Sequence, residues 1–85
     1  MKPKNYLAQR RLEVGQNVKR VRRFRGWTQE QVAEHLGCSR HRVYRIERGE
    51  LEYYLGELEL LAKAFDIPLS QLTESPTLEV LMEKQ

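Results

Sequence analysis

The chain has 85 residues, of which 40% are hydrophobic and 32% are charged, as expected for one soluble domain with a modest core. No apolar run approaches the roughly 20 residues of a transmembrane helix, and the charged start of the chain lacks the apolar stretch of a signal peptide. The single cysteine, Cys38, excludes an internal disulfide, so a reducing, cytoplasmic location is expected.

The net charge of +3 is distributed unevenly along the chain. Residues 1–50 carry 13 Lys/Arg and 5 Asp/Glu, a net charge of +8, whereas residues 51–85 carry 2 and 7, a net charge of −5. This division indicates one face that binds a polyanion and another that is kept away from it. A solvated basic surface without a partner is the alternative. Most of the cations are arginines, however, whose planar fork suits phosphates and base edges, so nucleic acid is the expected partner.

The first predicted helix ends at Gly26, because glycine commonly follows the last helical turn. Its buried face is expected to consist of four apolar residues at helical spacing: Val14, Val18, Val21 and Phe24. Leu7 extends the same stripe upstream and would place the start of the helix near Asn5. Gly15 weakens this extension by about 1 kcal/mol relative to alanine.

Two short helices are predicted next, joined by a tight turn. Thr28 and Gln31 have the spacing of a capping box at the start of the second helix, which Gly37 ends. Ser39 caps a third helix, which Gly49 ends. Because only two residues separate the glycine stop from the third helix, the pair is predicted to be a helix-turn-helix.

Three further segments follow in the acidic part of the chain. Apolar spacing predicts a fourth helix from Leu55 to Phe65, which Pro68 prevents from continuing. Residues 69–72 can form one more turn. Ser75, followed by proline, caps a last short helix over residues 77–84.

The expected fold class is therefore all-α, a compact five-helix domain, because strand signals are weak throughout. We expect the helix-turn-helix domain to span residues 14–73, between an N-terminal extension (1–13) and a C-terminal segment (74–85). Either extension could add a short helix.

The third helix combines a buried side with a basic one. At 100° per residue, Val43 and Ile46 lie on one side, whereas His41, Arg45 and Arg48 lie on the opposite side. The major groove of B-DNA admits an α-helix, and an arginine can donate two hydrogen bonds to guanine O6 and N7. The sequence thus predicts a helix that is anchored by two apolar residues and displays its cations to DNA.

Three motifs carry a resemblance to a known family. GWTQEQVA leads into the second helix, SRHRVYRIERG forms the third, and AKAFDIPLSQL ends the fourth and begins the fifth. In these motifs, residues 14–72 resemble the helix-turn-helix domain of lambdoid phage repressors, Cro and the xenobiotic-response-element-type regulators. The resemblance covers about 59 of the 85 residues. It implies a five-helix, lambda-repressor-like domain that binds operator DNA, usually as a dimer on a palindrome.

The resemblance also implies roles for individual residues. The positions that read bases are matched by Arg40, His41 and Arg45. The implied contacts to the DNA backbone are Arg20, Thr28, Gln29, Arg42, Tyr44 and Arg48. Arg22 and Glu47 match an arginine–glutamate pair that links the first helix to the third. Because arginine and histidine stand where the family often has glutamine, serine or threonine, the operators of known members cannot be carried over.

Several single residues outside these roles have more than one interpretation. His35, Cys38 and His41 have the spacing H-x2-C-x2-H, but a structural zinc site normally has four ligands and no fourth stands out, so no metal is expected. Cys38 is expected to pack in the core. The side chains of Tyr53 and Tyr54 fit phosphate contacts and packing equally well. The carboxylates of Glu57 and Glu59 are expected to be solvated.

The predicted function is a sequence-specific, double-stranded DNA-binding transcriptional regulator that acts as a repressor. No enzyme activity, cofactor, small-molecule substrate or membrane partner is expected, because no nucleophile–base pair or metal set is evident. The alternative is an antitoxin or anti-repressor of the same fold that acts mainly by binding protein. A homodimer is expected, with Leu78, Leu81 and Met82 forming an apolar stripe at its interface.

Overall fold

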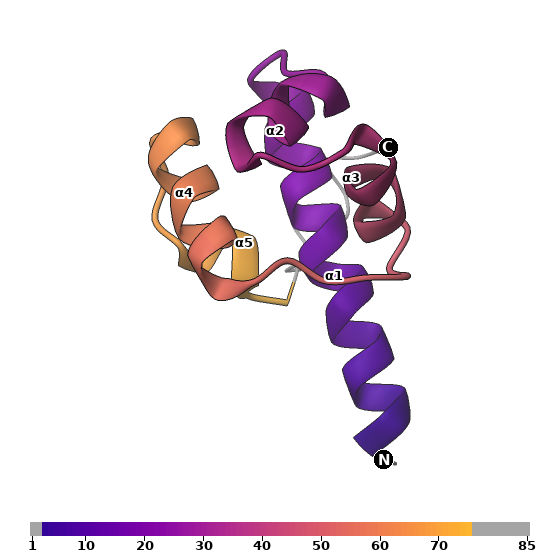
Figure 1. Cartoon of the computed structure of the whole chain (residues 1–85). Helices are drawn as coiled ribbons and strands as arrows, with labels where there is room; N and C mark the ends of the chain where they lie inside the picture. Colours follow the sequence, from indigo (N-terminus) through magenta and orange to yellow (C-terminus); the bar gives the residue numbers. More distant parts are fainter. Residues whose placement is uncertain (1–2, 76–85) are drawn as a thin grey trace.

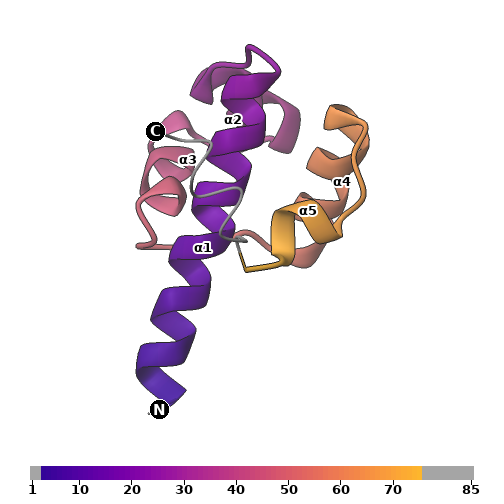
Figure 2. The same ribbon diagram turned by 180° about the vertical axis from the view of Figure 1, so that it is seen from behind.

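Five α-helices follow one another in the computed structural model, which describes residues 3–75 (Figures 1 and 2). They are α1 (Pro3–Phe24), α2 (Gln29–Leu36), α3 (Arg40–Glu47), α4 (Leu55–Phe65) and α5 (Ser70–Thr73). No strand occurs within this range, so the predicted all-α, five-helix fold is confirmed. No helix in residues 3–75 is long and apolar enough to cross a membrane. The helix predicted over residues 77–84, with Leu78, Leu81 and Met82, lies outside the described residues.

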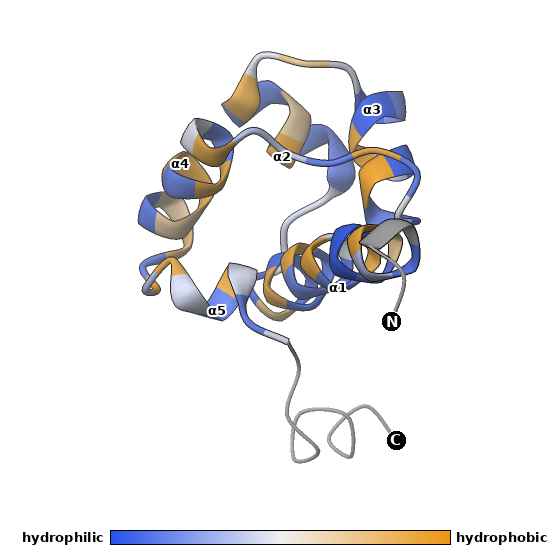
Figure 3. Cartoon of the chain, turned by 90° about the horizontal axis from the view of Figure 1, so that it is seen from below, coloured by the Kyte–Doolittle hydropathy of each residue, from blue (hydrophilic) through white to orange (hydrophobic). Residues whose placement is uncertain are grey.

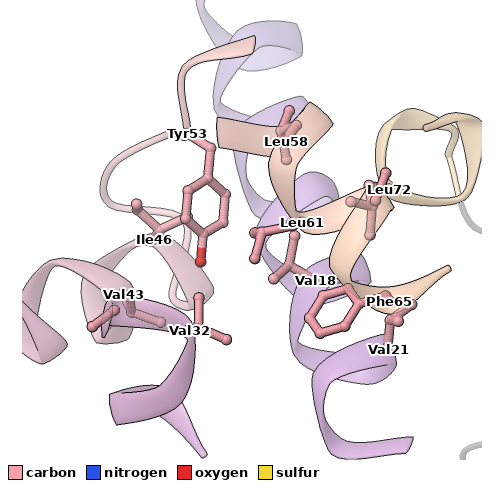
Figure 4. Close-up of a cluster of buried hydrophobic side chains, with 12 residues drawn as sticks. Val18, Val21, Val32, Val43, Ile46, Tyr53, Leu58, Leu61, Phe65 and Leu72 are labelled. Atoms are coloured by element: carbon pink, nitrogen blue, oxygen red, sulfur yellow. The ribbon is translucent and has the colours of Figure 1, made fainter. Parts of the chain in front are cut away.

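The core consists of buried hydrophobic residues from all five helices. Figure 3 shows hydrophobic (orange) and hydrophilic (blue) positions alternating along these helices. All five helices contribute side chains that are almost completely buried (Figure 4). The largest of these are Val18, Val32, Val43, Ile46, Leu61, Phe65 and Leu72. Burial of this kind holds short helices such as α2 and α3 in place, because helices of eight residues are marginal on their own.

The ends of α2 and α3 lie at the capping residues predicted from the sequence. Thr28 and Gln31 form both hydrogen bonds of the capping box on α2, and Gly37 ends that helix in the left-handed conformation, with φ of 70°. The hydroxyl of Ser39 accepts a hydrogen bond from the backbone N–H of Arg42 at the start of α3. These short-range signals are the reason that the bounds of α2 and α3 were predictable.

The long helix α1 has two parts. Its C-terminal half packs in the domain, whereas its N-terminal half projects from it (Figures 1 and 2). The predicted apolar stripe is therefore wrong at both ends, because Leu7 is 56% exposed on the projecting half and Phe24 is 83% exposed in the last turn. Asn17 is buried instead. Its amide donates hydrogen bonds to the carbonyl oxygens of Leu72 and Glu74 and so fastens α5 to α1.

The two adjacent tyrosines before α4 have different environments. Tyr53 is 6% exposed and packs in the core, whereas Tyr54 is 74% exposed. Figure 4 shows the Tyr53 ring between α3 and α4, beside Ile46. Tyr53 is thus a packing residue, and of the two only Tyr54 remains on the surface.

A glycine of α1, Gly15, lies where this helix crosses α3. A Cβ atom on Gly15 would overlap the carbonyl oxygen of Ile46 and come within 3.3 Å of the Cα of Glu47. The absent side chain lets the two helix backbones approach closely, and this explains a residue that helix propensity disfavours.

Gly15→Ala should therefore destabilise the protein by about 1–3 kcal/mol, the usual cost of overpacking, although alanine is the better helix former. Gly56→Ala in α4 is the matched control, since a Cβ there meets no atom within 4 Å and should stabilise by up to about 1 kcal/mol. Urea unfolding of both variants measures the difference. Equal effects of the two substitutions would contradict the close crossing of α1 and α3.

Candidate nucleic-acid interface

The turn between α2 and α3 sets the direction in which α3 is presented. The backbone N–H of Cys38 donates to the carbonyl oxygen of Ala33 at 3.0 Å, and that of Gly37 donates to Glu34 at 3.2 Å. Cys38 itself is half-buried and packs against the core, as predicted. These backbone hydrogen bonds close the end of α2, and the packing of Val32 and Ala33 with Val43 and Ile46 in one core holds α3 against α2.

One side of α3 is anchored in the core and the other is open. Val43 and Ile46 are completely buried. Arg40, His41, Tyr44 and Arg48 are exposed, and Arg45 is half-exposed. We call these five residues the recognition face. Their spacing along the helix places His41, Tyr44, Arg45 and Arg48 on one stripe.

Ring contacts order part of the recognition face. The rings of His41 and Tyr44 stack with centroids 6.2 Å apart. The guanidinium of Arg48 lies 5.4 Å from the Tyr44 ring centroid and donates to the Tyr44 hydroxyl at 3.3 Å. The recognition face therefore has the stacked rings of His41 and Tyr44 at its centre, with the Arg48 guanidinium over the Tyr44 ring. It offers flat surfaces for stacking as well as positive charge.

A buried network fixes the end of α3 that lies nearest α1. Arg22 of α1 donates from Nε to Glu47 Oε2 at 2.7 Å and from Nη2 to Glu47 Oε1 at 3.0 Å. Arg22 Nη1 also donates to the carbonyl oxygen of Trp27 at 2.9 Å. Gln29, at the start of α2, donates to Glu47 Oε1 at 3.0 Å. The carboxylate of Glu47 thus joins α1, α2 and α3.

The residues predicted to contact the DNA backbone lie at the start of α2 and on α1, as well as on α3. Gln29 lies at the N-terminus of α2 and is half-exposed, so its amide can face both Glu47 and a ligand. The Thr28 hydroxyl accepts from the backbone N–H of Gln31 as a helix cap. Arg20 donates to the Asn17 side chain at 3.1 Å. It also lines a hollow of about 430 Å³ between α1 and the end of α3, together with Gln16, Lys19, Arg23 and Glu47.

Arg42 faces α4 rather than the recognition face. Its Nη1 and Nη2 atoms donate to the two carboxylate oxygens of Glu57 at 2.7 and 2.9 Å. The pair is mostly shielded from water, and it raises the pKa of Arg42 above its usual value. Burial opposes ionisation of Glu57, but the bonds from Arg42 and the backbone N–H of Tyr54 outweigh it and lower the pKa of that carboxyl. The prediction that Glu57 is merely solvated was wrong.

The exposed arginines also have acidic partners, which no motif in the sequence indicated. Glu30 of α2 lies 2.9 Å from Arg40 Nε. The carboxylate of Glu50 accepts from Arg45 Nε at 3.0 Å and from Arg48 Nε at 2.9 Å. Exposed pairs of this kind contribute little to stability, so they leave the arginines able to bind an anion.

The short helices α2 and α3, their tight turn and the exposed face of α3 together define a domain of the helix-turn-helix class. The chain belongs to the helix-turn-helix domain family, whose model matches residues 13–74. This match confirms the resemblance on which the sequence interpretation relied.

Two curated relatives are similar to most of this chain. One is the competence pilus inhibition repressor of Acinetobacter baylyi, 36% identical over 61 residues, or 72% of this chain and 56% of the relative. The other is the immunity repressor protein of Bacillus phage phi105, 37% identical over 67 residues, or 79% of this chain and 46% of the relative. The chain thus spans about half the length of the curated relatives that it matches.

Two solved structures have a similar fold. The restriction-modification controller protein C.AhdI from Aeromonas hydrophila is 32% identical, with a TM-score of 0.65 over 73% of this chain and 94% of that one. The hypothetical transcription factor NHTF from Neisseria is 26% identical, with a TM-score of 0.70 over 89% of this chain and 85% of that one. Both comparisons cover more than the three motifs read from the sequence.

Arg22→Met should destabilise the fold by about 3 kcal/mol, because Glu47 would keep a buried charge without its main partner. Arg22 is 9% exposed and Glu47 6% exposed, so the carboxylate left behind would be poorly hydrated. Arg23→Met is the matched control, since it removes an exposed charge from the same turn of α1. Thermal unfolding of the two variants should differ by several degrees. Equal melting temperatures would show that the pair does not hold the helices.

Proposed function

We propose that this chain represses transcription by binding a palindromic operator in double-stranded DNA as a homodimer, with α3 in the major groove. The observation that carries the proposal is the geometry of α3, which is anchored by two buried apolar residues and displays a basic face. The names of the two repressor relatives support the same activity. The protein bound to its operator would exclude the transcription machinery from the same stretch of DNA.

Contacts are assigned by their place on the surface. Arg40, His41 and Arg45, on the first two turns of α3, are proposed to read base edges, and arginine is well suited to guanine. Backbone contacts are proposed for Arg20, Thr28, Gln29, Tyr44 and Arg48. Arg42, a backbone contact by resemblance, would have to leave Glu57 to reach a phosphate, so we propose that it orients α3 against α4 instead.

Selection of bound duplexes from a random DNA pool tests this function. Enrichment of a sequence with two-fold symmetry would support it, and titration at two salt concentrations would separate specific from non-specific binding. A folded chain that enriches no sequence would contradict the proposal and favour the alternative, an antitoxin or anti-repressor that acts on another protein.

The two kinds of arginine should respond differently to the same change. Arg45→Ala should relax the preference at one base pair and cost about 1–3 kcal/mol in operator binding. Arg20→Ala should weaken binding to all duplexes equally and reduce the slope of log affinity against log salt by about one. Fluorescence titrations on the operator and on single-base variants distinguish these outcomes. Uniform weakening by Arg45→Ala would make Arg45 a backbone contact.

Dimerisation is proposed through the projecting half of α1 and the C-terminal segment. Tyr6 and Leu7 on the projecting half of α1 are exposed apolar residues. Ser75 lies beside this half, because its hydroxyl accepts from Arg10 and donates to Glu13. Ser75, the last described residue, thus lies beside Arg10 and Glu13, and the sequence after it carries the apolar stripe of Leu78, Leu81 and Met82.

Truncation after Ser75 should lower dimer affinity and abolish tight binding to a palindrome, while leaving a folded monomer. Two recognition helices must lie about 34 Å apart to read half-sites one helical turn apart, and a monomer cannot bind both. Analytical ultracentrifugation of the truncated and full chains measures this. A truncated chain that sediments as an intact dimer would place the interface elsewhere.

A further inference from the structure

Glu50 connects two arginines of the recognition face. It follows Gly49, which ends α3 with φ of 80° and turns the chain back. The backbone N–H of Glu50 donates to the carbonyl oxygen of Arg45 at 3.0 Å, which places the residue under the last turn of the helix. Its two carboxylate oxygens then accept from different arginines, Oε1 from Arg45 and Oε2 from Arg48.

The pairing leaves a particular set of donors free. Arg45 reaches Glu50 through Nε, and among the described residues its terminal Nη1 and Nη2 atoms have no hydrogen-bond partner. Arg48 likewise uses Nε for Glu50, and its Nη1 donates to the hydroxyl of Tyr44. Arg45 is therefore held so that the end of its guanidinium, with two parallel N–H donors, remains available. These are the donors that match O6 and N7 of a guanine.

We infer that Glu50 is a positioning residue that orients Arg45 for end-on contact with a guanine and sets base discrimination there. This inference rests on the proposed function. Glu50 itself does not touch the base. Its carboxylate acts by restricting the rotation of the long Arg45 side chain before DNA binds. Less rotational freedom is then lost on binding, so more of the contact energy appears as discrimination.

Docking makes this restraint stronger than it is on the free surface. In water an exposed pair of this kind contributes little. A helix in the major groove excludes water from its own face, and the lower local dielectric strengthens the remaining hydrogen bonds. Glu50 keeps its charge in this setting, since hydrogen bonds from Arg48 and then Arg45 lower the pKa of its carboxyl.

The charge of Glu50 has a second effect, on DNA that lacks the preferred base. A carboxylate on a surface that approaches phosphates weakens sequence-independent binding. The residue should therefore lower affinity for random DNA while raising preference for the operator, which is how a repulsive group contributes to specificity. Charge alone would change the affinities for all duplexes by the same factor.

The test uses the full chain and three duplexes: the selected operator, the same operator with the base pair sensed by Arg45 exchanged, and a random sequence. Glu50→Ala should lower the ratio of the first two affinities roughly tenfold, within the range that one bidentate arginine–guanine contact supplies. It should also raise affinity for the random duplex. Glu52→Ala, an equal change of charge at an exposed position two residues on, should leave the ratio unchanged.

Glu50→Asp separates orientation from charge. It keeps the carboxylate but shortens the side chain, so it cannot bridge Arg45 and Arg48 as glutamate does. We expect the operator preference to fall in this variant while binding to the random duplex stays as in the wild type. A wild-type ratio in Glu50→Asp would mean that Glu50 acts only by repulsion and would overturn the inference.

A double-mutant comparison assigns the effect to Arg45. In an Arg45→Ala background, Glu50→Ala should not change the ratio at that base pair, because the side chain it orients is gone. A further fall there would overturn the inference by showing that Glu50 acts through another residue. A wild-type chain that selects no duplex would overturn the proposed function together with it, whereas a selective wild type with an unchanged ratio in Glu50→Ala overturns only the inference.

Discussion

The buried carboxylate of Glu47 determines how the three helices that build the interface meet. It accepts hydrogen bonds from Arg22 and Gln29, so α1, α2 and the end of α3 share one acceptor. Such a charge costs much desolvation, and its contribution to net stability is small. Its value lies in geometry, because an apolar replacement could fill the space without fixing where the third helix points. Gly15 acts beside it by letting the α1 and α3 backbones approach closely.

Internal carboxylates reduce the positive charge that the recognition surface presents. The first 50 residues carry a net charge of +8, yet the three arginines of α3 and its C-cap residue Arg48 have acidic partners in Glu30, Glu50 and Glu57. The partners differ in consequence. Glu57 shares a partly buried, two-bond pair with Arg42 and orients α3 on α4. Glu30 lies at an exposed position where a DNA phosphate could compete for Arg40, whereas Glu50 bridges Arg45 and Arg48. A low free charge weakens non-specific binding more than it weakens base contacts.

Local signals explain what could be predicted from the sequence. Caps at Thr28 and Ser39 and the left-handed glycine at Gly37 act within one turn, so the bounds of α2 and α3 could be read directly. Burial at the ends of α1 depended instead on which helices pack there, and Phe24 was wrongly assigned to the core. The Arg42–Glu57 pair joins residues 15 positions apart on different helices, and no local pattern indicates it.

The recognition face itself shows why its chemistry was only partly predictable. Helical periodicity correctly separated Val43 and Ile46 from the basic side, because a wheel of one helix contains that information. The orientation of each arginine depends on the backbone reversal at Gly49, which returns Glu50 to the helix that precedes it. A sequence gives the donors at such a surface, whereas the fold decides which of their N–H groups are already used. Specificity depends on the groups that remain, so the acids around a recognition helix matter as much as its cations.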